Sequence, residues 1–272
     1  SYNGFLSFSG SLTNMQNFVL NLWKSQTRDG HQLFHGFENS IQLQQLSFGY
    51  QPGDLILENV DLSLYRNETL AIVGESGSGK TTLMNILSGL LQSTSGRMLV
   101  DGQEVADLNI TSLQQRIGYI TQEPVIFDDT IYNNVTFWAK KTASNLKLFW
   151  EALEKASITD FVKGLAYGED ARLGNNGINL SGGQKQRISI ARELYKEVDF
   201  LFMDEATSAL DSETEKMIQN NIDKLKGHYT ILIIAHRLST IKNADRVVVL
   251  KKGTIEKVGS YKKVLEESDT FK

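Results

Sequence analysis

The residues best suited to chemistry by type and spacing form one glycine-rich stretch, Gly74-Glu75-Ser76-Gly77-Ser78-Gly79-Lys80-Thr81. This stretch fits the pattern G-x-x-x-x-G-K-[ST], in which backbone amides cradle phosphate groups. In such a loop Gly77 and Gly79 let the backbone approach the phosphates, Lys80 neutralises the β and γ oxygens, and the Thr81 hydroxyl binds Mg²⁺. The stretch therefore predicts a site for a nucleoside triphosphate with its Mg²⁺.

Two elements must hold this loop in place. Before it, Thr69-Leu70-Ala71-Ile72-Val73 is a short apolar run, typical of a fully buried parallel strand. After it, the residues from Thr82 to Ser88 indicate a helix. A strand, a glycine loop and a helix in this order direct the loop amides and the helix N-terminus onto one anion, which disfavours a chance match in a glycine-rich turn.

Polar residues also follow two later apolar runs. Asp204-Glu205 follows residues 200–203, and His236 follows residues 230–235. At a strand end beside the phosphate loop, Asp204 can hold Mg²⁺ through water and Glu205 can act on the attacking water. His236 is placed where an imidazole can contact a γ-phosphate. Taken alone the acidic pair is an ordinary strand end, but after a phosphate loop its spacing favours chemistry.

Two further polar stretches belong to the same constellation. Gln122 lies in Tyr119-Ile120-Thr121-Gln122-Glu123-Pro124, where the α/β pattern gives way to a helical one. Leu180-Ser181-Gly182-Gly183-Gln184 opens a helix, so its serine and glycine amides form a second anion site. Phosphate-loop chemistry by itself does not require that second site.

Composition limits the class of protein. The 272 residues carry a net charge of -4 and no cysteine, which excludes a disulfide scaffold and cysteine-based zinc sites. There is no broad basic surface for nucleic acid, so a nucleotide must be held locally. No apolar run approaches the roughly 18 residues of a membrane span. Because the chain begins with Ser1 rather than Met, we expect a fragment of a longer protein.

The rest of the pattern predicts an α/β fold: a P-loop NTPase (RecA-like) core with an N-terminal antiparallel β subdomain and an inserted α-helical subdomain. Alternation between residues 41 and 50, with one phase slip, predicts β-structure ending at Tyr50. Residues 97–103 predict a strand entering an Asp-Gly hairpin turn. The expected boundaries are 1–38 for an amphipathic helix and linker, 39–123 for the first half of the core with the β subdomain, 124–195 for the helical subdomain and 196–272 for the second half.

Residues 12–23 have apolar side chains at helical spacing. This helix either packs on its own domain or is the tail of a membrane domain upstream. Residues 24–38 indicate a polar linker.

Together these motifs resemble the nucleotide-binding domain of ABC transporters, from about residue 39 to the C-terminus. Leu180 to Gln184 matches the family's signature LSGGQ, and His236 its switch histidine. Asp204-Glu205 is similar to the Walker B end, and Ser208-Ala209-Leu210-Asp211 to the D-loop. One motif could be an accident, but five in the family's order could not.

The resemblance implies a role for each matching residue around ATP. Tyr50 matches the aromatic that stacks on adenine, an interaction worth about 1 to 3 kcal/mol. Glu205 would be the general base, and His236 would hold the γ-phosphate and the water in line. Gln122 matches the Q-loop residue that senses Mg²⁺ and contacts the membrane domain. The implied Mg²⁺ ligands are Thr81, Gln122 and Asp204, and the implied catalytic residues are Lys80, Gln122, Glu205 and His236.

The resemblance also implies a second copy of the domain. Ser181 and Gly183, with Gly182 and Gln184 of the same turn, would act in trans on ATP bound to the partner's phosphate loop. Two ATP molecules would then be buried between head-to-tail domains. Because both half-sites are complete in this chain, we expect a homodimer.

Subfamily cues indicate an exporter. Residues 127–134 and 236–240 look like exporter-type domains, which implies a membrane domain on the same full-length chain, at the cytoplasmic face of the inner membrane. One stretch departs from the pattern, because exporters commonly carry Gly-Glu-x-Gly where this chain has Gly174-Asn175-Asn176-Gly177. The missing acid predicts that the usual coupling contact is lost or made by other residues.

Two other functions remain open at this point. One is a non-transport ABC ATPase of DNA repair or translation, although the interval between Gln122 and Leu180 leaves no room for a long coiled coil. The other is a clamp that binds ATP without hydrolysing it, which Glu205, His236 and the intact signature disfavour.

Overall fold

The computed structural model describes residues 30–204, 212–235 and 241–268. The helix expected over residues 12–23 lies outside these ranges, as do Glu205, residues 208–211 and His236. Within the described ranges, no helix is both long enough and apolar enough to cross a membrane.

A six-stranded sheet forms the centre of the molecule, in the order β10-β9-β3-β8-β7-β6. All neighbouring pairs are parallel except β10 with β9. The apolar runs predicted as buried strands are confirmed as β3, β7, β8 and β9. The bounds are β3 (Thr69–Val73), β6 (Ile117–Ile120), β7 (Phe200–Asp204), β8 (Thr230–Ile234), β9 (Arg246–Lys251) and β10 (Thr254–Gly259).

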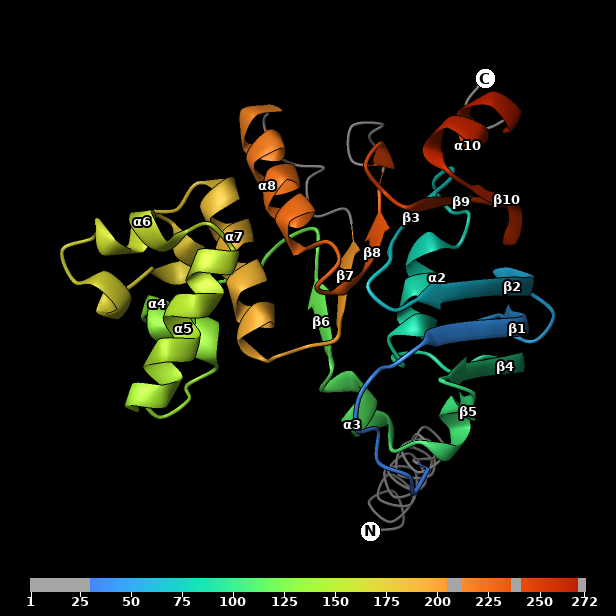
Figure 1. Ribbon diagram of the computed structural model, residues 1–272, viewed down its shortest axis with the longest axis horizontal. Coiled ribbons are helices and arrows are strands. Elements are labelled where there is room, and N and C mark those ends of the chain that lie inside the picture. The colour runs from blue at the N-terminus through green and yellow to red at the C-terminus, as the bar shows by residue number, and fades with distance from the viewer. Residues whose placement is uncertain (1–29, 205–211, 236–240, 269–272) are drawn as a thin grey trace, which may run out of the picture.

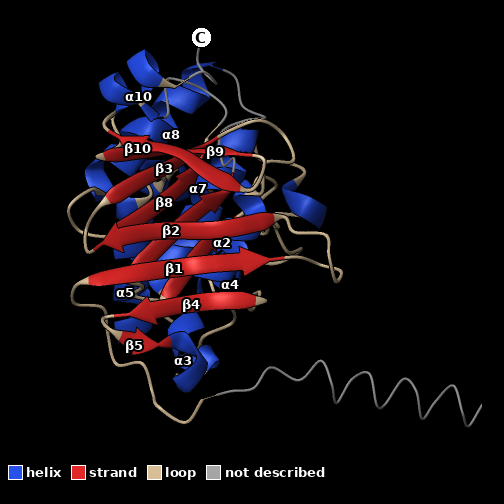
Figure 2. Cartoon of the chain, turned by 90° about the vertical axis from the view of Figure 1, so that its right-hand side faces the viewer, coloured by secondary structure: helices blue, strands red, loops and turns tan. Residues whose placement is uncertain are grey.

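A second, antiparallel sheet has the order β2-β1-β4-β5, and Figure 2 shows its strands in front of the helices. The predicted phase slip is confirmed, because the register of β1 against β2 shifts around Gln45, whose φ is 46°. The Asp-Gly hairpin is also confirmed, since Asp101 and Gly102 both have positive φ between β4 and β5. The bounds are β1 (Ser40–Phe48), β2 (Leu57–Tyr65), β4 (Ser95–Val100) and β5 (Gln103–Glu104).

The alternation of side chains along the central strands separates two apolar cores. In β3, Leu70 and Ile72 face the core shared with the antiparallel sheet and α2 (Lys80–Leu87). Ala71 and Val73 face the core shared with the helices. Both faces of the sheet are therefore covered, which explains why its parallel strands are apolar without alternation in the sequence.

The predicted helical insertion forms a lobe on one side of the central sheet, at the left of Figure 1. Its longest helices are α5 and α7, and they pack on each other. Three-residue turns η1 to η3 complete the structure (Val105–Asp107, Gly168–Asp170 and Asn175–Gly177). The helix bounds are α3 (Ile110–Gln114), α4 (Ile131–Thr136), α5 (Ala143–Lys155), α6 (Thr159–Lys163), α7 (Gly182–Tyr195), α8 (Ser212–Leu225) and α10 (Tyr261–Glu267).

The described part of the expected linker, residues 30–38, packs on the core. Its backbone pairs with η1 through Gly30 and Gln32, whose amides donate to Leu108 O at 3.0 Å and Asp107 O at 3.1 Å. Phe37 is buried, and its ring lies 4.4 Å from that of Phe200 on β7. Phe34 also packs on the core, and its amide donates to Ser112 Oγ at 2.9 Å. The polar composition of the segment gave no sign of these contacts, because only two aromatic side chains and the backbone make them.

Candidate nucleotide site

The glycine-rich loop connects β3 to α2, in the order that the sequence predicts. Lys80 is buried at the first turn of α2, and its ammonium donates to Gly74 O and to Glu75 O, each at 2.9 Å. The carbonyl oxygens at the start of the loop thus hold the Lys80 ammonium inside the loop. A positive charge in this position attracts the oxygens of a bound phosphate.

Two glycines of the loop are required by close contact with neighbouring backbone. A Cβ at Gly74 would lie 2.1 Å from Leu250 O on β9. Gly79 has a φ of +101°, and its Cβ would lie 2.8 Å from a methyl carbon of Leu57 on β2. Gly77 has a φ of +78° and faces open space. The loop is therefore pressed against β9 and β2 at its base and left free at its tip.

This difference predicts unequal effects of two alanine substitutions. Gly74→Ala should lower the free energy of unfolding by about 3 kcal/mol, because a backbone oxygen cannot move away from the new methyl group. Gly77→Ala should cost only about 1 kcal/mol for its left-handed backbone, yet weaken ATP binding. Chemical denaturation and nucleotide titration of both variants check this pair. Equal losses of stability would contradict the loop geometry.

The loop and α2 fit a nucleoside triphosphate with Mg²⁺. The N-cap of α2 is Gly79, which offers no side chain to its first amides, so these donors remain available to a phosphate. Thr81 is exposed on the first turn, where its hydroxyl can bind a cation. Among the described residues no preformed cluster of three carboxylate, histidine or cysteine ligands exists. The few protein ligands suit Mg²⁺, which keeps several waters and takes further oxygens from phosphates.

The register of the parallel strands brings the other predicted residues to the same edge of the sheet. Asp204 at the end of β7 lies opposite Ile234 of β8, and Ile72 of β3 is paired with the same residue. On the other side of β7, Met203 is paired with Ile120, two residues before the exposed Gln122. Since the carboxyl ends of β3, β8, β7 and β6 meet at one edge, they form the usual position of a ligand in an open α/β sheet.

Sequence reasoning did not single out Tyr119, which joins two of these elements. Its hydroxyl on β6 donates to Asn85 Oδ1 on α2 at 3.0 Å. Burial, together with the nearby charge of Asp204, raises the pKa of Tyr119 to about 12. The phenol therefore stays a neutral donor and ties the strand that leads to Gln122 to the helix that begins at Lys80. A tyrosine in a short apolar strand gives no signal of this contact in the sequence.

Tyr50 lies in the turn between β1 and β2, beside the phosphate loop. Its side chain is 63% exposed, and its ring meets Phe48 edge-on at 4.9 Å. The turn closes with Ile56 N donating to Phe48 O at 2.8 Å, and Ile56 O would lie 3.1 Å from a Cβ on Gly79. An exposed aromatic side chain in a turn whose other end, at Ile56, contacts the loop suits stacking on a base.

The signature residues begin α7, in the helical lobe. Ser181 is the N-cap in a reciprocal capping box: its hydroxyl accepts from Gln184 N at 3.3 Å, and its amide donates to Gln184 Oε1 at 2.8 Å. Gly182 is exposed in the first turn. Because the Ser181 oxygen accepts within the box, its own proton remains free to donate to an anion at the helix N-terminus.

The stretch that departs from the exporter pattern precedes this helix. Asn176 has a φ of 50° inside η3, and a Cβ at Gly177 would lie 3.1 Å from methyl carbons of Ile126 and Leu180. The stretch is therefore packed between the segment after Gln122 and the signature. Ile178, beside it, is 78% exposed. No acidic side chain replaces the missing glutamate within residues 174–178.

Comparison with protein families matches residues 57–208 to the family described as ABC transporter. The chain is 42% identical over 248 residues to an ATP-dependent lipid A-core flippase of Ralstonia nicotianae, covering 90% of this chain and 42% of that protein. It is 39% identical over 269 residues to the heterocyst differentiation ATP-binding protein HepA of Nostoc sp., covering 97% and 44%. The chain thus spans less than half the length of these relatives.

Among solved structures, that of a bacterial Atm1-family ABC exporter with ATP bound is similar to this one, with a TM-score of 0.83 and 32% sequence identity. The match covers 97% of this chain and 47% of the other. The expected fold class and the expected exporter type are confirmed by these similarities. With its phosphate loop, its antiparallel sheet and its separate helical lobe, the chain belongs to the ABC transporter family, as a nucleotide-binding domain of the exporter type.

Proposed function

We propose that this chain binds and hydrolyses ATP with Mg²⁺ and thereby drives export across a membrane. The observation that carries the proposal is the alignment of four parallel strand ends beside the buried Lys80, with a second anion-binding helix N-terminus at Ser181. A single phosphate loop does not need a second such terminus. The similarity to an exporter with ATP bound adds support.

Each residue of the site has a stated task in this proposal. Lys80 and the first amides of α2 bind the β and γ phosphates, and Tyr50 stacks on the base. Mg²⁺ would be held by Thr81, by Asp204 through water and by Gln122, and it would neutralise the charge that develops on the phosphates. Glu205 accepts the proton of the attacking water. His236 orients that water and the γ-phosphate.

The proposed assembly is a head-to-tail homodimer joined to membrane domains. Ser181, Gly182, Gly183 and Gln184 donate to ATP on the partner's phosphate loop, so each site is built from two chains. The membrane domain precedes the described residues on the same full-length protein, as the length of the relatives supports. In this proposal the domain lies at the cytoplasmic face of the inner membrane.

A composite site predicts that ATP turnover per molecule rises with protein concentration. In a dilute solution each chain has half of two sites, and dimer formation completes both. Steady-state phosphate release measured over a wide concentration range checks this. A total rate strictly proportional to concentration would contradict action in trans.

Mixing two inactive variants sharpens the same test. Lys80→Ala removes the cation of the phosphate loop, so this chain no longer binds the phosphates, but it leaves the signature turn Ser181–Gln184 intact. Gly182→Glu keeps the loop, and its carboxylate at the exposed N-terminus of α7 suits the helix dipole but repels a phosphate. Mixed dimers hold one complete site, so phosphate release should return on mixing. If each chain worked alone, the mixture would stay inactive.

A further inference from the structure

A buried cation lies near the end of α7, far along the helix from Ser181. Arg192 is 5% exposed, and its guanidinium lies over two neighbouring rings, 5.3 Å from the centre of Phe127 and 5.2 Å from that of Phe137. Its Nε donates to Asn134 O at 2.7 Å and its Nη2 to Asn134 Oδ1 at 3.3 Å. Burial lowers the pKa of Arg192 from its ordinary value, partly offset by the neighbouring charge of Glu193. Arginine remains charged in proteins, so this cation is stabilised by one asparagine and two aromatic faces.

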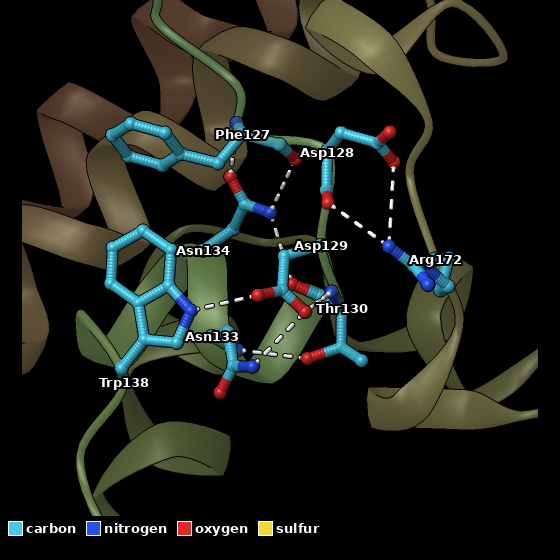
Figure 3. Close-up of polar contacts among 8 residues, drawn as sticks. All are labelled: Phe127, Asp128, Asp129, Thr130, Asn133, Asn134, Trp138 and Arg172. Atoms are coloured by element: carbon cyan, nitrogen blue, oxygen red, sulfur yellow. Dashed lines mark hydrogen bonds and ion pairs between the residues drawn. The ribbon is translucent and has the colours of Figure 1, made fainter.

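Asn134 on α4 is fully buried and uses both ends of its amide. Phe127 N donates to its Oδ1 at 2.8 Å, while its Nδ2 donates to Phe127 O and Thr130 O, each at 3.0 Å. Figure 3 shows this side chain facing the backbone of Phe127. One asparagine thus fixes the segment 127–130 on one side and the α7 arginine on the other.

We propose that Asn134 and Arg192 are positioning residues for the signature turn, which lock α7 to the segment 127–134 so that Ser181–Gln184 and the chain after Gln122 move as one body. The inference rests on the proposed function for its consequence, because the signature turn matters only if it meets ATP. Its structural part, the lock itself, rests on the contacts above.

The geometry of α7 makes this lock effective at a distance. Arg192 lies eleven residues from Ser181, which is about 16 Å along a helix. A tilt of about 5° at the arginine would therefore move the signature turn by about 1.4 Å. Displacements of about 1 Å are enough to lower catalytic rates strongly. Arg187 also holds the middle of the helix by donating to Ser157 O at 3.0 Å, so loss of the lock should tilt α7 without unfolding it.

The lock also lies where the helical lobe leaves the central sheet. Residues 121–123 and 125 are exposed, while residues from 126 onwards are held by the asparagine and by the adjacent segment 171–173. The exposed stretch is therefore the connection between the central sheet and the helical lobe, and Gln122 lies within it. A movement of the helical lobe therefore shifts both the signature turn Ser181–Gln184 and the end of this connection that is attached to the lobe.

Arg192→Lys is the sharpest test, because it keeps the charge and removes the planar fork. In the 272-residue chain we expect amide hydrogen exchange of residues 181–186 to be faster, and ATP turnover at high protein concentration to fall about tenfold, as one or two hydrogen bonds to a charged group are lost. ATP affinity in dilute solution should change less than about twofold, since the phosphate loop lies on another lobe. Arg172→Lys is the matched control, because the exposed Arg172 side chain donates to Asp128 O of the same segment at 3.2 Å (Figure 3), while the backbone pairing of residues 171–173 with 129–131 does not depend on that side chain. It should leave all three quantities unchanged.

The double variant decides whether the two residues act as a unit. Asn134→Ala removes the Oδ1 acceptor and the Nδ2 donors but keeps the backbone oxygen that accepts from Arg192 Nε at 2.7 Å. It should lower turnover, and the double variant should cost clearly less than the sum of the two single losses. If Asn134→Ala does not fold, Asn134→Asp replaces it. Its carboxylate keeps an acceptor for Arg192 and adds a negative charge beside it, but loses the donors to Phe127 O and Thr130 O, so it should release the segment 127–130 while Arg192 stays paired. Additive losses, or exchange at residues 181–186 that stays at the parent rate, would overturn the lock.

The outcomes separate this inference from the proposed function. If the parent chain shows no concentration-dependent turnover, the proposed function fails, and the exchange rates still test the lock. If the parent chain does show it and Arg192→Lys behaves like Arg172→Lys, only the lock fails. A drop in ATP affinity as large as the drop in turnover would indicate general loss of structure, which contradicts a positioning role.

Discussion

Lys80→Ala should reduce ATP affinity by at least about a hundredfold, because two or more charge-assisted hydrogen bonds to phosphate oxygens are lost and each contributes about 1.5 to 3 kcal/mol. The buried ammonium at the centre of the loop is the cation nearest to the loop amides. Titration with a fluorescent ATP analogue measures the effect. Affinity close to that of the parent chain would mean that the loop does not bind the phosphates.

The same substitution removes two hydrogen bonds within the loop, from the ammonium to Gly74 O and Glu75 O. Its effect on folding must therefore be measured beside its effect on binding. Lys147→Ala is the control, because Lys147 is an exposed lysine on α5, outside the phosphate loop, and its loss should leave affinity nearly unchanged. Thermal unfolding of both variants shows whether Lys80→Ala also lowers the stability of the fold. If its unfolding temperature matches that of the control, the loss of ATP affinity comes from the missing cation.

Glu205→Gln should lower ATP turnover by about 10² to 10⁴, the usual contribution of a general base, while leaving ATP binding intact. Glu205 follows Asp204, which the register of β7 puts at the ligand-binding edge of the sheet. The neutral amide cannot accept the proton of the attacking water. Because ATP then persists between the two chains, a dimer should be trapped and elute earlier on size exclusion.

Asp204→Asn provides a contrast to that variant. If Asp204 holds Mg²⁺, its loss should raise the Mg²⁺ concentration needed for half-maximal turnover, whereas Glu205→Gln should lower the maximal rate at saturating Mg²⁺. An unchanged turnover number in Glu205→Gln would remove this residue as the base. Elution of Glu205→Gln with ATP as a monomer would argue against two sandwiched nucleotides.

Much of the fold was predictable because its signals are local. The apolar runs that became β3, β7, β8 and β9 are short and apolar throughout, which favours buried strands. The Asp-Gly hairpin and the slip in β1 likewise follow from residue types and alternation. β2 was missed, although Leu57, Val60, Leu62 and Leu64 are buried at spacings of two and three. The irregular spacing around Asn59, whose φ is 48°, hides that alternation.

The residues of the candidate site were predictable in identity but not in arrangement. The glycine pattern predicts which residues can approach a phosphate. It does not predict that Leu250 O leaves no room for a Cβ at Gly74, or that Leu57 leaves little room for one at Gly79. Those neighbours come from β9 and β2, far away in the chain. Asn134 was noticed only as part of the exporter-like stretch 127–134, and Arg192 gave no signal, because a polar residue at helical spacing normally indicates a solvated face. Their exposed fractions of 0% and 5% are a property of the packed lobe.

By itself the sequence determined the chemistry of this protein: a loop for a nucleoside triphosphate, carboxylates and an imidazole after apolar strands, and a second anion site at a helix N-terminus. These signals are carried by neighbouring residues, so the chain need not be folded to reveal them. The tertiary structure decided which strand ends share an edge, which face of each strand meets which core, and how α7 is fixed to the segment after Gln122. Such contacts join residues far apart in the chain, and their stability comes from desolvation and shape matching, which exist only once the two lobes have packed.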